Sequence, residues 1–328
     1  MFAVKMKQSV IYTFMNKNLY TLSIMLAGMI LVSCSESDEF NPFDHKTTGE
    51  FNPNTITFRK SSENMDIVET WSNIVRNNSN KVTSYGYTRE VEGEFKETEK
   101  RECTLDYFTD HTGQEVIRTS TAVEFYKSDK GIEEQYTEET VENITLNKEG
   151  YITSIYATTD RKNTDGITST TTSQRTFTYK NNLCTGSAYA DSNKRITYKY
   201  NWNAYPLTNI TILKEDLKNN TIEYNTYDYT FDKNKFYDYS GTEIIPFVQS
   251  GMPQVYASMG YLGKCTPYIL LEEVQGGYTK YAGTTSENIE ITNRYNFNVE
   301  PGSKIVYSGI SEIYNNYSIT FSKQSDAQ

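Results

Sequence analysis

The chain has 328 residues, a formal net charge of −10 and a sequence pI near 5.0, which argue against nucleic-acid binding and against docking on anionic lipid through basic side chains. Tyr is abundant at 28 residues, yet the mean hydropathy is −0.65. Few aliphatic and many Tyr and Thr residues favour strands with one wet and one half-buried face, and disfavour helical bundles.

Residues 1–33 have the pattern of an export signal. Lysines but no acidic residues precede an apolar run over 19–32, and the first acid is Glu36. The run is shorter than the roughly 20 residues that span a bilayer. Leu31-Val32-Ser33-Cys34 resembles the lipobox of bacterial lipoproteins, in which the cysteine is acylated and becomes the mature terminus. We therefore predict a signal peptide over 1–33 and lipidation at Cys34. The alternative is a buried N-terminal helix, and Met15 is an alternative start.

An acidic, flexible tether is predicted over 34–54. Ser35-Glu36-Ser37-Asp38-Glu39 resembles the signal that sends Bacteroidota lipoproteins to the outer leaflet of the outer membrane. A merely solvated spacer is the alternative, because acidic runs are usually solvated. Asn-Pro pairs at 41–42 and 52–53 are typical of a linker. We expect a lipid-anchored protein in the outer membrane, with surface display favoured over the inner leaflet.

Alternation of polar and apolar residues begins at Thr55 and predicts one all-β domain over 55–324. Asp66–Arg76 also fits a helix face, but we favour a strand, because turn residues at 77–80 and a second alternating segment follow it. Ile289–Val299 and Ser311–Ser322 are expected to form the last strand pair. The other predicted strands are Lys81–Tyr87, Glu94–Phe108, Glu115–Lys127, Ile132–Leu146, Thr168–Lys180, Leu183–Ala190, Lys194–Trp202, Asn209–Glu215, Thr221–Asp232, Tyr268–Gln275, Tyr278–Ala282 and 305–307.

The alternation stops between Gly241 and Pro267, where Pro and Gly accumulate. Pro253–Leu262 fits one short helix with Pro near its start and Gly263 after its end. We predict a short helical or irregular segment near 241–267 that crosses or caps one end of the sheet.

A turn-and-strand phrase recurs along the chain, as in Asn80-Lys-Val-Thr-Ser-Tyr85, Gly150-Tyr-Ile-Thr-Ser-Ile155 and Lys194-Arg-Ile-Thr-Tyr198. Its uneven spacing excludes a solenoid of fixed period. With Asn147-Lys-Glu-Gly-Tyr-Ile-Thr-Ser-Ile155, the break near 241–267 and the closing aromatic strand, these Tyr-rich phrases resemble a family of Bacteroidota lipoproteins of unknown function. The resemblance implies a single large, strongly curved antiparallel meander of β-hairpins, an open-barrel or porin-like sheet. It implies no active site.

Sequence patterns for catalysis are missing. His45 lies in the tether and His111 at a predicted hairpin tip, too far along a strand from Cys103 to pair with it. No nucleophile elbow, zinc-protease or phosphate-loop motif occurs. Cys103, Cys184 and Cys265 allow at most one disulfide and match no metal knuckle. We expect no enzyme activity, no metal and no cofactor; a glycosidase built from distant carboxylates is the catalytic alternative.

Aromatic residues that share strand faces are the remaining candidate site. Stacked Tyr and Trp rings could bind a glycan or a partner protein, or could instead form the half-buried core of a sheet poor in aliphatic residues. The candidate binding surface consists of Trp71, Tyr198, Tyr200, Trp202, Tyr227 and Tyr229. We expect a non-catalytic binding module for glycan or protein. The alternatives are a structural accessory subunit of an outer-membrane complex and a carrier of an apolar ligand.

Overall fold

The computed structural model describes residues 49–50, 54–79, 81–203, 206–236, 239–240, 256, 261–263, 268–281, 284–287, 290–300, 304–311 and 316–322. The chain divides into residues 1–46 and a compact unit over 47–328, and only the second contains described residues. The signal peptide predicted over 1–33, the lipidated Cys34, most of the tether and Cys265 therefore lie outside the described part.

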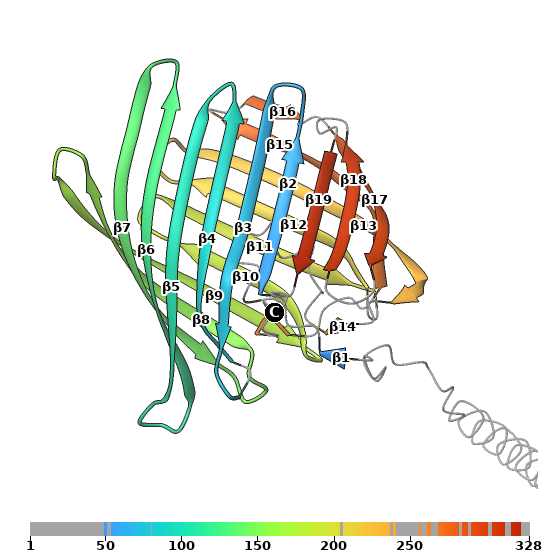
Figure 1. Ribbon diagram of the computed structural model, residues 1–328, viewed down its shortest axis with the longest axis horizontal. Helices are drawn as coiled ribbons and strands as arrows, with labels where there is room; N and C mark the ends of the chain where they lie inside the picture. The colour runs from blue at the N-terminus through green and yellow to red at the C-terminus, as the bar shows by residue number, and fades with distance from the viewer. Residues whose placement is uncertain are drawn as a thin grey trace, which may run out of the picture. The chain divides into compact units, whose positions relative to one another are not determined.

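The described part is built from β-strands joined mainly as hairpins (Figure 1). The strands are β1 Gly49–Glu50, β2 Thr55–Ser61, β3 Met65–Arg76, β4 Val82–Gly93, β5 Lys96–Thr109, β6 Glu115–Asp129, β7 Ile132–Leu146, β8 Ile152–Asn163, β9 Thr168–Lys180, β10 Leu183–Ala190, β11 Lys194–Trp202, β12 Leu207–Asp216, β13 Thr221–Phe236, β14 Tyr239–Ser240, β15 Tyr268–Tyr281, β16 Thr284–Glu287, β17 Ile291–Glu300, β18 Lys304–Ser311 and β19 Asn316–Ser322. Among the described residues, no helix is long and apolar enough to cross a membrane.

Consecutive strands pair antiparallel from β2 to β13, and the meander continues through β15, β17, β18 and β19. The hairpin strand β16 also pairs with β15. The last strand, β19, pairs with β2, so the sheet closes into a barrel. Outside the barrel sheet, β1 and β14 form a short parallel pair. The predicted all-β fold, one strongly curved antiparallel meander, is confirmed, and β3 is a strand as expected.

The turn chemistry explains why these strands form hairpins. Lys130 and Gly131 connect β6 to β7 with φ values of 49° and 82°, and Asn181 and Asn182 connect β9 to β10 with 54° and 65°. Two successive residues with positive φ make the type I′ turn, whose twist matches that of paired strands. Asn and Gly adopt this conformation at the lowest cost.

Strand β15 corrects one sequence-based boundary. We expected a break at Gly276-Gly277, but β15 runs through both residues and pairs with β13 along its length. Gly277 has φ 150°, and a Cβ there would lie 2.0 Å from the carbonyl oxygen of Tyr224. The glycine therefore allows a close approach between the two strands and does not end the strand.

The order of the last strands is a second correction. Ile289–Val299 and Ser311–Ser322 were expected to pair with each other, but β18 lies between them. Val306 of β18 is opposite Asn298 of β17 on one side and Thr320 of β19 on the other. The strand near 305–307 is longer than expected, and β19 is left free on its far edge to pair with β2.

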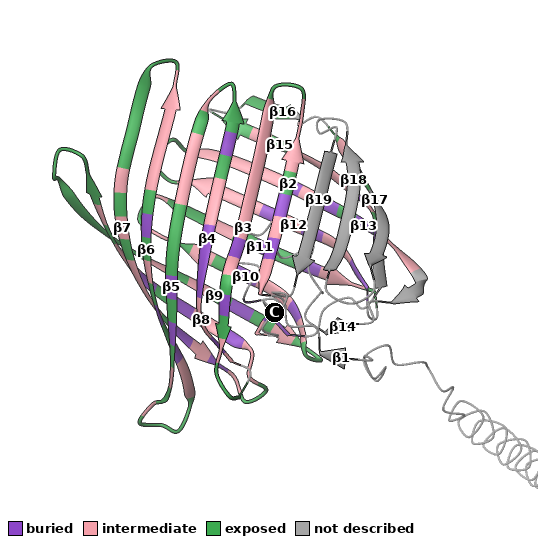
Figure 2. Cartoon of the chain, in the orientation of Figure 1, coloured by how far each residue is buried: buried purple, intermediate pink, exposed green. Residues whose placement is uncertain are grey.

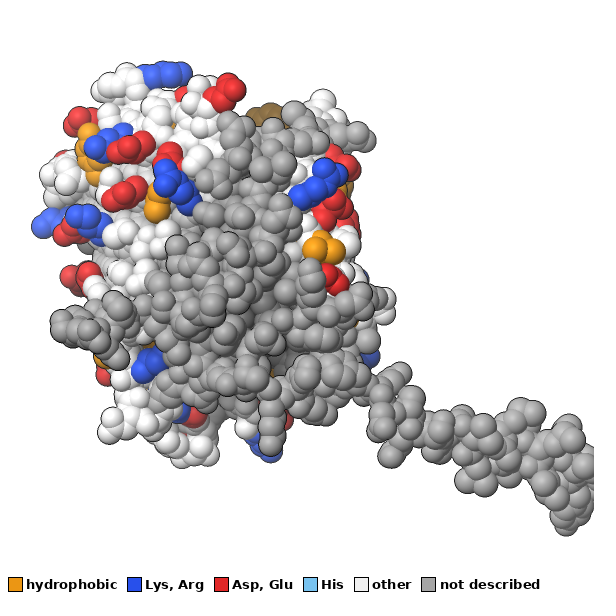
Figure 3. All heavy atoms as spheres, turned by 45° about the vertical axis from the view of Figure 1, so that its right-hand side comes forward, with side chains coloured by type: hydrophobic (Ala, Val, Ile, Leu, Met, Phe, Trp, Pro, Cys, Tyr) orange, Lys and Arg blue, Asp and Glu red, His pale blue; other side chains and the backbone are white. Residues whose placement is uncertain are grey.

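Alternate residues of each strand face the barrel interior and the outer wall. In β5, Cys103 and Leu105 are buried, whereas Glu102, Thr104 and Asp106 are exposed. Residues opposite each other on paired strands point to the same face of the sheet. Cys103 is opposite Tyr85 and Thr121, so all three side chains face the interior. Many outward positions are polar, and on the one face that Figure 3 shows, the described part carries acidic and basic side chains with few hydrophobic ones between them.

The interior differs between the two ends of the barrel. The large buried side chains, such as Ile117, Ile144 and Leu207, gather toward the end that bears the turns 77–81, 110–114, 147–151, 181–182 and 203–206, which we call the packed end. The opposite end bears the turns 62–64, 94–95, 130–131, 164–167, 191–193 and 217–220, and we call it the charged end. Figure 2 shows exposed residues (green) at the β6–β7 and β8–β9 turns of this end, at the upper left.

Described residues of the 241–267 segment lie in the packed end. Tyr256 and Leu262 are 1% and 0% exposed and belong to the hydrophobic core. The backbone N–H of Ile152 donates to the carbonyl oxygen of Tyr261 at 2.9 Å. The segment between β13 and β15 therefore contributes side chains to the barrel core. The helix predicted over Pro253–Leu262 otherwise lies outside the described residues.

Candidate functional site

The inner wall near the charged end carries ion pairs, most of which join neighbouring strands. Arg89 contacts Glu69 at 3.2 Å and also contacts Glu97. Further pairs are Arg101 with Glu99, Arg161 with Glu138 at 2.5 Å, and Lys214 with Glu223 at 3.0 Å. With Arg175, these residues form a set that we call the inner charged belt: Glu69, Arg89, Glu97, Glu99, Arg101, Glu138, Arg161, Arg175, Lys214 and Glu223.

Strand parity places the belt on the interior face. Glu99 and Arg101 continue the alternation of the buried Cys103 and Leu105 along β5. Arg101 is opposite Tyr87, a residue of the buried core, and Glu97 is opposite the fully buried Val91. The belt is therefore a continuation of the core-facing surface with charged residues in place of apolar ones.

Aromatic rings hold the arginines of the belt. The guanidinium carbon of Arg161 lies 3.9 Å from the ring centre of Tyr136, which stacks on Phe125 at 4.5 Å. Arg101 lies 5.0 Å from the ring centre of Tyr87. Such cation–π contacts help to hold the guanidinium groups in place beside the rings. Both arginines keep more than a third of their side chains exposed, at 41% and 43%.

Water reaches the inner wall at the charged end. Ser169 and Thr171 lie an even number of positions from buried Phe177 on β9, so their side chains also face the interior. Both are exposed. In contrast, the interior side chains of the packed end, such as Ile152 and Cys184, are fully buried. The described inner wall is therefore buried toward one end and solvent-accessible toward the other. We call the accessible stretch the mouth; charged, hydroxyl and aromatic groups line it.

The predicted aromatic surface lies largely in the core. The exposed fractions are 6% for Trp71, 5% for Tyr198, 3% for Tyr200, 9% for Tyr227 and 6% for Tyr229. The Trp71 ring packs against the rings of Phe58 and Tyr87, with distances between ring centres of 5.3 and 4.8 Å. Partly buried Trp202 donates from Nε1 to the carbonyl oxygen of Cys184 at 2.7 Å. These rings present no open stacking platform, and their burial supports the core alternative.

The half-buried carboxylate of Glu142 links three elements. Glu142 accepts hydrogen bonds from the Tyr256 hydroxyl and from Thr119 Oγ1, each at 2.9 Å. Burial raises the pKa of Tyr256 well above its ordinary value, so the hydroxyl stays protonated. The hydrogen bonds explain why these polar groups are tolerated in an apolar interior.

The two thiols in the described part of the chain, Cys103 and Cys184, show no sign of nucleophilic activation. Burial raises the pKa of Cys103, and it raises the pKa of Cys184 to about 12. His111 lies in the turn beyond the end of β5, away from Cys103 in the core. The described residues contain no group of three or more side chains that could hold a metal ion.

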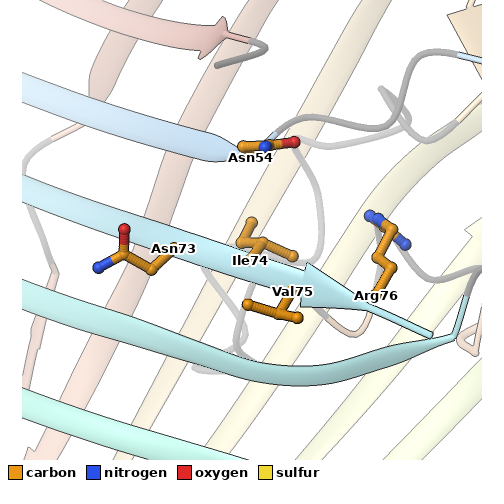
Figure 4. A pocket seen from close by; sticks show the side chains of 5 residues that line it. All are labelled: Asn54, Asn73, Ile74, Val75 and Arg76. Atoms are coloured by element: carbon orange, nitrogen blue, oxygen red, sulfur yellow. The ribbon is translucent and has the colours of Figure 1, made fainter. Parts of the chain in front are cut away.

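Two pockets open beside turns of the packed end. One, of about 390 Å³, is lined by Asn54, Asn73, Ile74, Val75 and Arg76 (Figure 4). It forms where Asn73, at φ 51°, bulges β3 away from β4. The other, of about 520 Å³, lies between the turns 112–115 and 147–150. Both are shallow and lined by turn and strand-end residues, so neither gathers converging charged groups as the belt does.

The sequence analysis did not identify the belt, because alternation alone does not show which face of a charged strand the closed sheet encloses. A signal was present in β5, where Glu97, Glu99 and Arg101 occupy the same alternate positions as Cys103 and Leu105.

Comparison with known proteins gives a fold-level likeness alone. No family model matches the chain, and no curated protein matches it. One solved structure that matches is described as a porin-like protein from Bacteroides uniformis ATCC 8492, with 14% sequence identity and a TM-score of 0.45. The match covers 84% of this chain and 98% of that one.

Proposed function

We propose that this protein is a non-catalytic binding module, anchored by lipid to the outer membrane and displayed at the cell surface, which binds a glycan or protein ligand in the mouth at the charged end. The inner charged belt carries the proposal. Its ion pairs lie on an inward wall where side chains such as Arg161 and Lys214, 41% and 43% exposed, remain accessible to a ligand. Charged groups beside aromatic rings are the kind of groups that orient a polar ligand in a binding site.

The polar outer wall supports anchoring through Cys34. A barrel wall that faces lipid carries an outward apolar band about 25 Å tall. Outward positions of β5 and β7 here carry exposed charges, including Glu102 and Glu139. Strand β2 begins at the packed end, so the chain from Cys34 joins the barrel there, at the end opposite the mouth.

Paired bulky substitutions test the location of binding. Thr171 and Thr172 are adjacent exposed residues of β9 that point to the interior and the outer wall. The full chain, purified in detergent, is assayed against a panel of oligosaccharides and surface proteins. Thr171→Trp is expected to weaken binding by placing a bulky ring on the inner wall beside Arg161 of the belt, whereas Thr172→Trp preserves it. Equal effects of the two variants, or a blank panel, would count against the proposal.

Anchoring is tested separately. Cys34→Ser is expected to prevent incorporation of labelled fatty acid and to release the protein from the membrane fraction. Protease added to intact cells should digest the wild-type protein if it is displayed outward. A variant that stays membrane-bound without the thiol would contradict lipid anchoring.

Exposed apolar residues at the charged end favour a second candidate, an accessory subunit of an outer-membrane complex. Ile132, Ile167 and Leu217 lie at three turns of this end and are 75%, 63% and 47% exposed. Each lies on a separate turn of the rim, where a partner that covers this end of the barrel would contact it. Co-purification of a partner from mildly solubilised membranes, lost in Ile132→Lys with Ile167→Lys, would support this candidate.

A further inference from the structure

Three threonines form one row across the inner wall of the mouth. Thr140 of β7 is opposite Thr159 of β8, and Thr159 is opposite Thr171 of β9. Opposed residues on paired strands point to the same face of the sheet. Thr171 lies an even number of positions from buried Phe177, so the whole row faces the interior. We call Thr140, Thr159 and Thr171 the threonine row.

The next row toward the charged end carries an ion pair. Glu138 is opposite Arg161, and Arg161 is opposite Ser169. The Nε of Arg161 donates to Glu138 at 2.5 Å, and its guanidinium carbon lies 3.9 Å from the ring centre of Tyr136. A carboxylate and a ring of β7 therefore hold the guanidinium, while 41% of the Arg161 side chain stays exposed.

The two rows offer hydrogen-bond donors and acceptors together. The hydroxyl oxygens of Thr140 and Thr159 lie 2.9 Å apart, so one hydroxyl donates to the other. A hydroxyl has one donor and two acceptor sites, so this pair retains a donor and further acceptor sites. Ser169 and Thr171 are exposed beside it. A guanidinium carries five N–H donors, of which the bond from Arg161 to Glu138 uses one.

Taking the proposed function as its basis, we propose that the ligand of the mouth is a neutral glycan whose hydroxyl groups bind to the threonine row and to the Glu138–Arg161 pair. A sugar hydroxyl donates and accepts at the same time, which matches the mixed donors and acceptors of both rows. Hydrogen bonds to ionised groups are roughly twice as strong as those between neutral groups. The ion pair therefore adds affinity for a hydroxyl without requiring a charge on the ligand.

The pairing of charges in the belt selects against an ionic ligand. The belt contains as many carboxylates as cationic groups. An anion that approaches Arg161 meets Glu138 in contact with it and the negative charge of Glu134 nearby. A cation that approaches Glu138 meets Arg161 in the same way. Repulsion from the like-charged partner offsets the attraction in both cases, and an uncharged ligand avoids this repulsion.

The small polar side chains of the two rows favour a glycan over a protein ligand. The fully buried centre of a protein interface is usually depleted of charge and built on large anchor side chains. The two rows instead present hydroxyl groups and ions, and these side chains are half-buried or exposed.

Adjacent residues that face opposite sides of the wall provide matched variants. Thr171 faces the mouth and Thr172 faces the outer wall, and both are exposed. Thr171→Val and Thr172→Val each remove one hydroxyl and keep a β-branched side chain suited to a strand. Glu138→Gln and Glu139→Gln are the second pair, because Glu138 contacts Arg161 inside whereas Glu139 is exposed outside. Thermal unfolding verifies that each variant keeps an intact barrel.

Binding of the full chain in detergent is measured by calorimetry. The probes are maltotetraose, xylotetraose and mannotetraose as neutral glycans, trigalacturonate as an anion, a glucosamine trimer as a cation, and a Ser-Gly hexapeptide. We expect at least one neutral glycan to bind at least about tenfold more tightly than either charged saccharide. Raising the salt concentration to about 0.5 M should leave its binding unchanged, because salt screens interactions between charges.

Thr171→Val should weaken binding of the neutral glycan about three- to tenfold, which corresponds to the loss of one hydrogen bond, and Thr172→Val should leave it unchanged. Glu138→Gln removes the carboxylate that contacts Arg161, so it should reduce the preference for the neutral glycan over trigalacturonate. Glu139→Gln should preserve that preference.

Binding of trigalacturonate or the glucosamine trimer as tight as that of every neutral glycan would overturn this inference and leave the proposed function standing. So would equal effects of the two valine variants or of the two glutamine variants. Binding of the hexapeptide alone would overturn the glycan assignment. If none of the probes binds, the inference fails, and the Thr171→Trp comparison with the wider panel decides the proposed function.

Discussion

Tyr256 ties the segment between β13 and β15 to the barrel interior, and its removal tests how much that tie contributes to stability. The side chain is 1% exposed, and its hydroxyl donates to Glu142 at 2.9 Å. A hydrogen bond to a charged group contributes about 1.5–3 kcal/mol to stability. Because Glu142 is only half-buried, we expect Tyr256→Phe to lower the free energy of unfolding by an amount near the lower end of that range. Tyr256→Ala also leaves a cavity, and loss of a buried aromatic ring costs about 3–5 kcal/mol.

Urea unfolding of the full chain, followed by circular dichroism, gives the free energy of unfolding for each variant. Tyr156→Phe is the control, because Tyr156 is 50% exposed on the outer wall, and its change should stay within about 0.5 kcal/mol. In a double-mutant cycle, Tyr256→Phe and Glu142→Gln should be non-additive by at least about 0.5 kcal/mol, because their side chains are in contact. Additive effects, or a Tyr256→Phe variant as stable as the Tyr156→Phe control, would show that the Tyr256–Glu142 hydrogen bond does not stabilise the barrel.

Three further outcomes follow from the structure. Gly277→Ala should destabilise the barrel by about 2 kcal/mol or more, because its Cβ would lie 2.0 Å from a backbone oxygen, whereas Gly276→Ala, with its nearest atom at 3.5 Å, should be mild in the same urea assay. Burial raises the pKa of Tyr85 and Tyr256 above the ordinary 10.0, so stability is full below pH 10 and falls as the pH rises further; tyrosinate absorbance should increase together with loss of the β spectrum, and a barrel still folded after all tyrosines ionise would contradict this. Trp202→Phe should cost about 1 kcal/mol through its lost hydrogen bond to backbone, and an unchanged melting temperature would argue against that bond.

Local pattern was sufficient to predict most strands. The phrases around Val82, Ile152 and Ile196 mark a turn followed by alternation, and each lies at or near the start of a strand in the structure. Ile132–Leu146 matches β7 at both ends. Alternation identifies the two faces of a strand but not its distant partner, so the pairing of β19 with β2 had no local signal. The same limit explains the misplaced pairing of the last strands.

The site was harder to predict, because a side chain's role depends on which face the closed sheet encloses. Glu138 and Glu139 are adjacent and look alike in sequence, yet Glu138 pairs with Arg161 inside the barrel while Glu139 is exposed outside. The Tyr residues pose the converse problem. Tyr198 and Tyr200 have the alternation of a binding face, but they are buried because their face is the inner one.

The width of the barrel explains why one chain builds a dry end and a charged end. Eight strands enclose an interior that side chains just fill, and barrels of about twice that number leave room for water. This barrel has strands well beyond eight, so its own inward residues cannot meet across the middle. At the packed end the gap is closed in part by side chains from outside the sheet, including Tyr256 and Leu262. The belt lies where the wall is hydrated, and there inward apolar residues would face water while paired ions do not suffer full desolvation. The described residues between β14 and β15 therefore enlarge the buried part of the interior, and the charged belt lies on the part of the wall that they leave accessible.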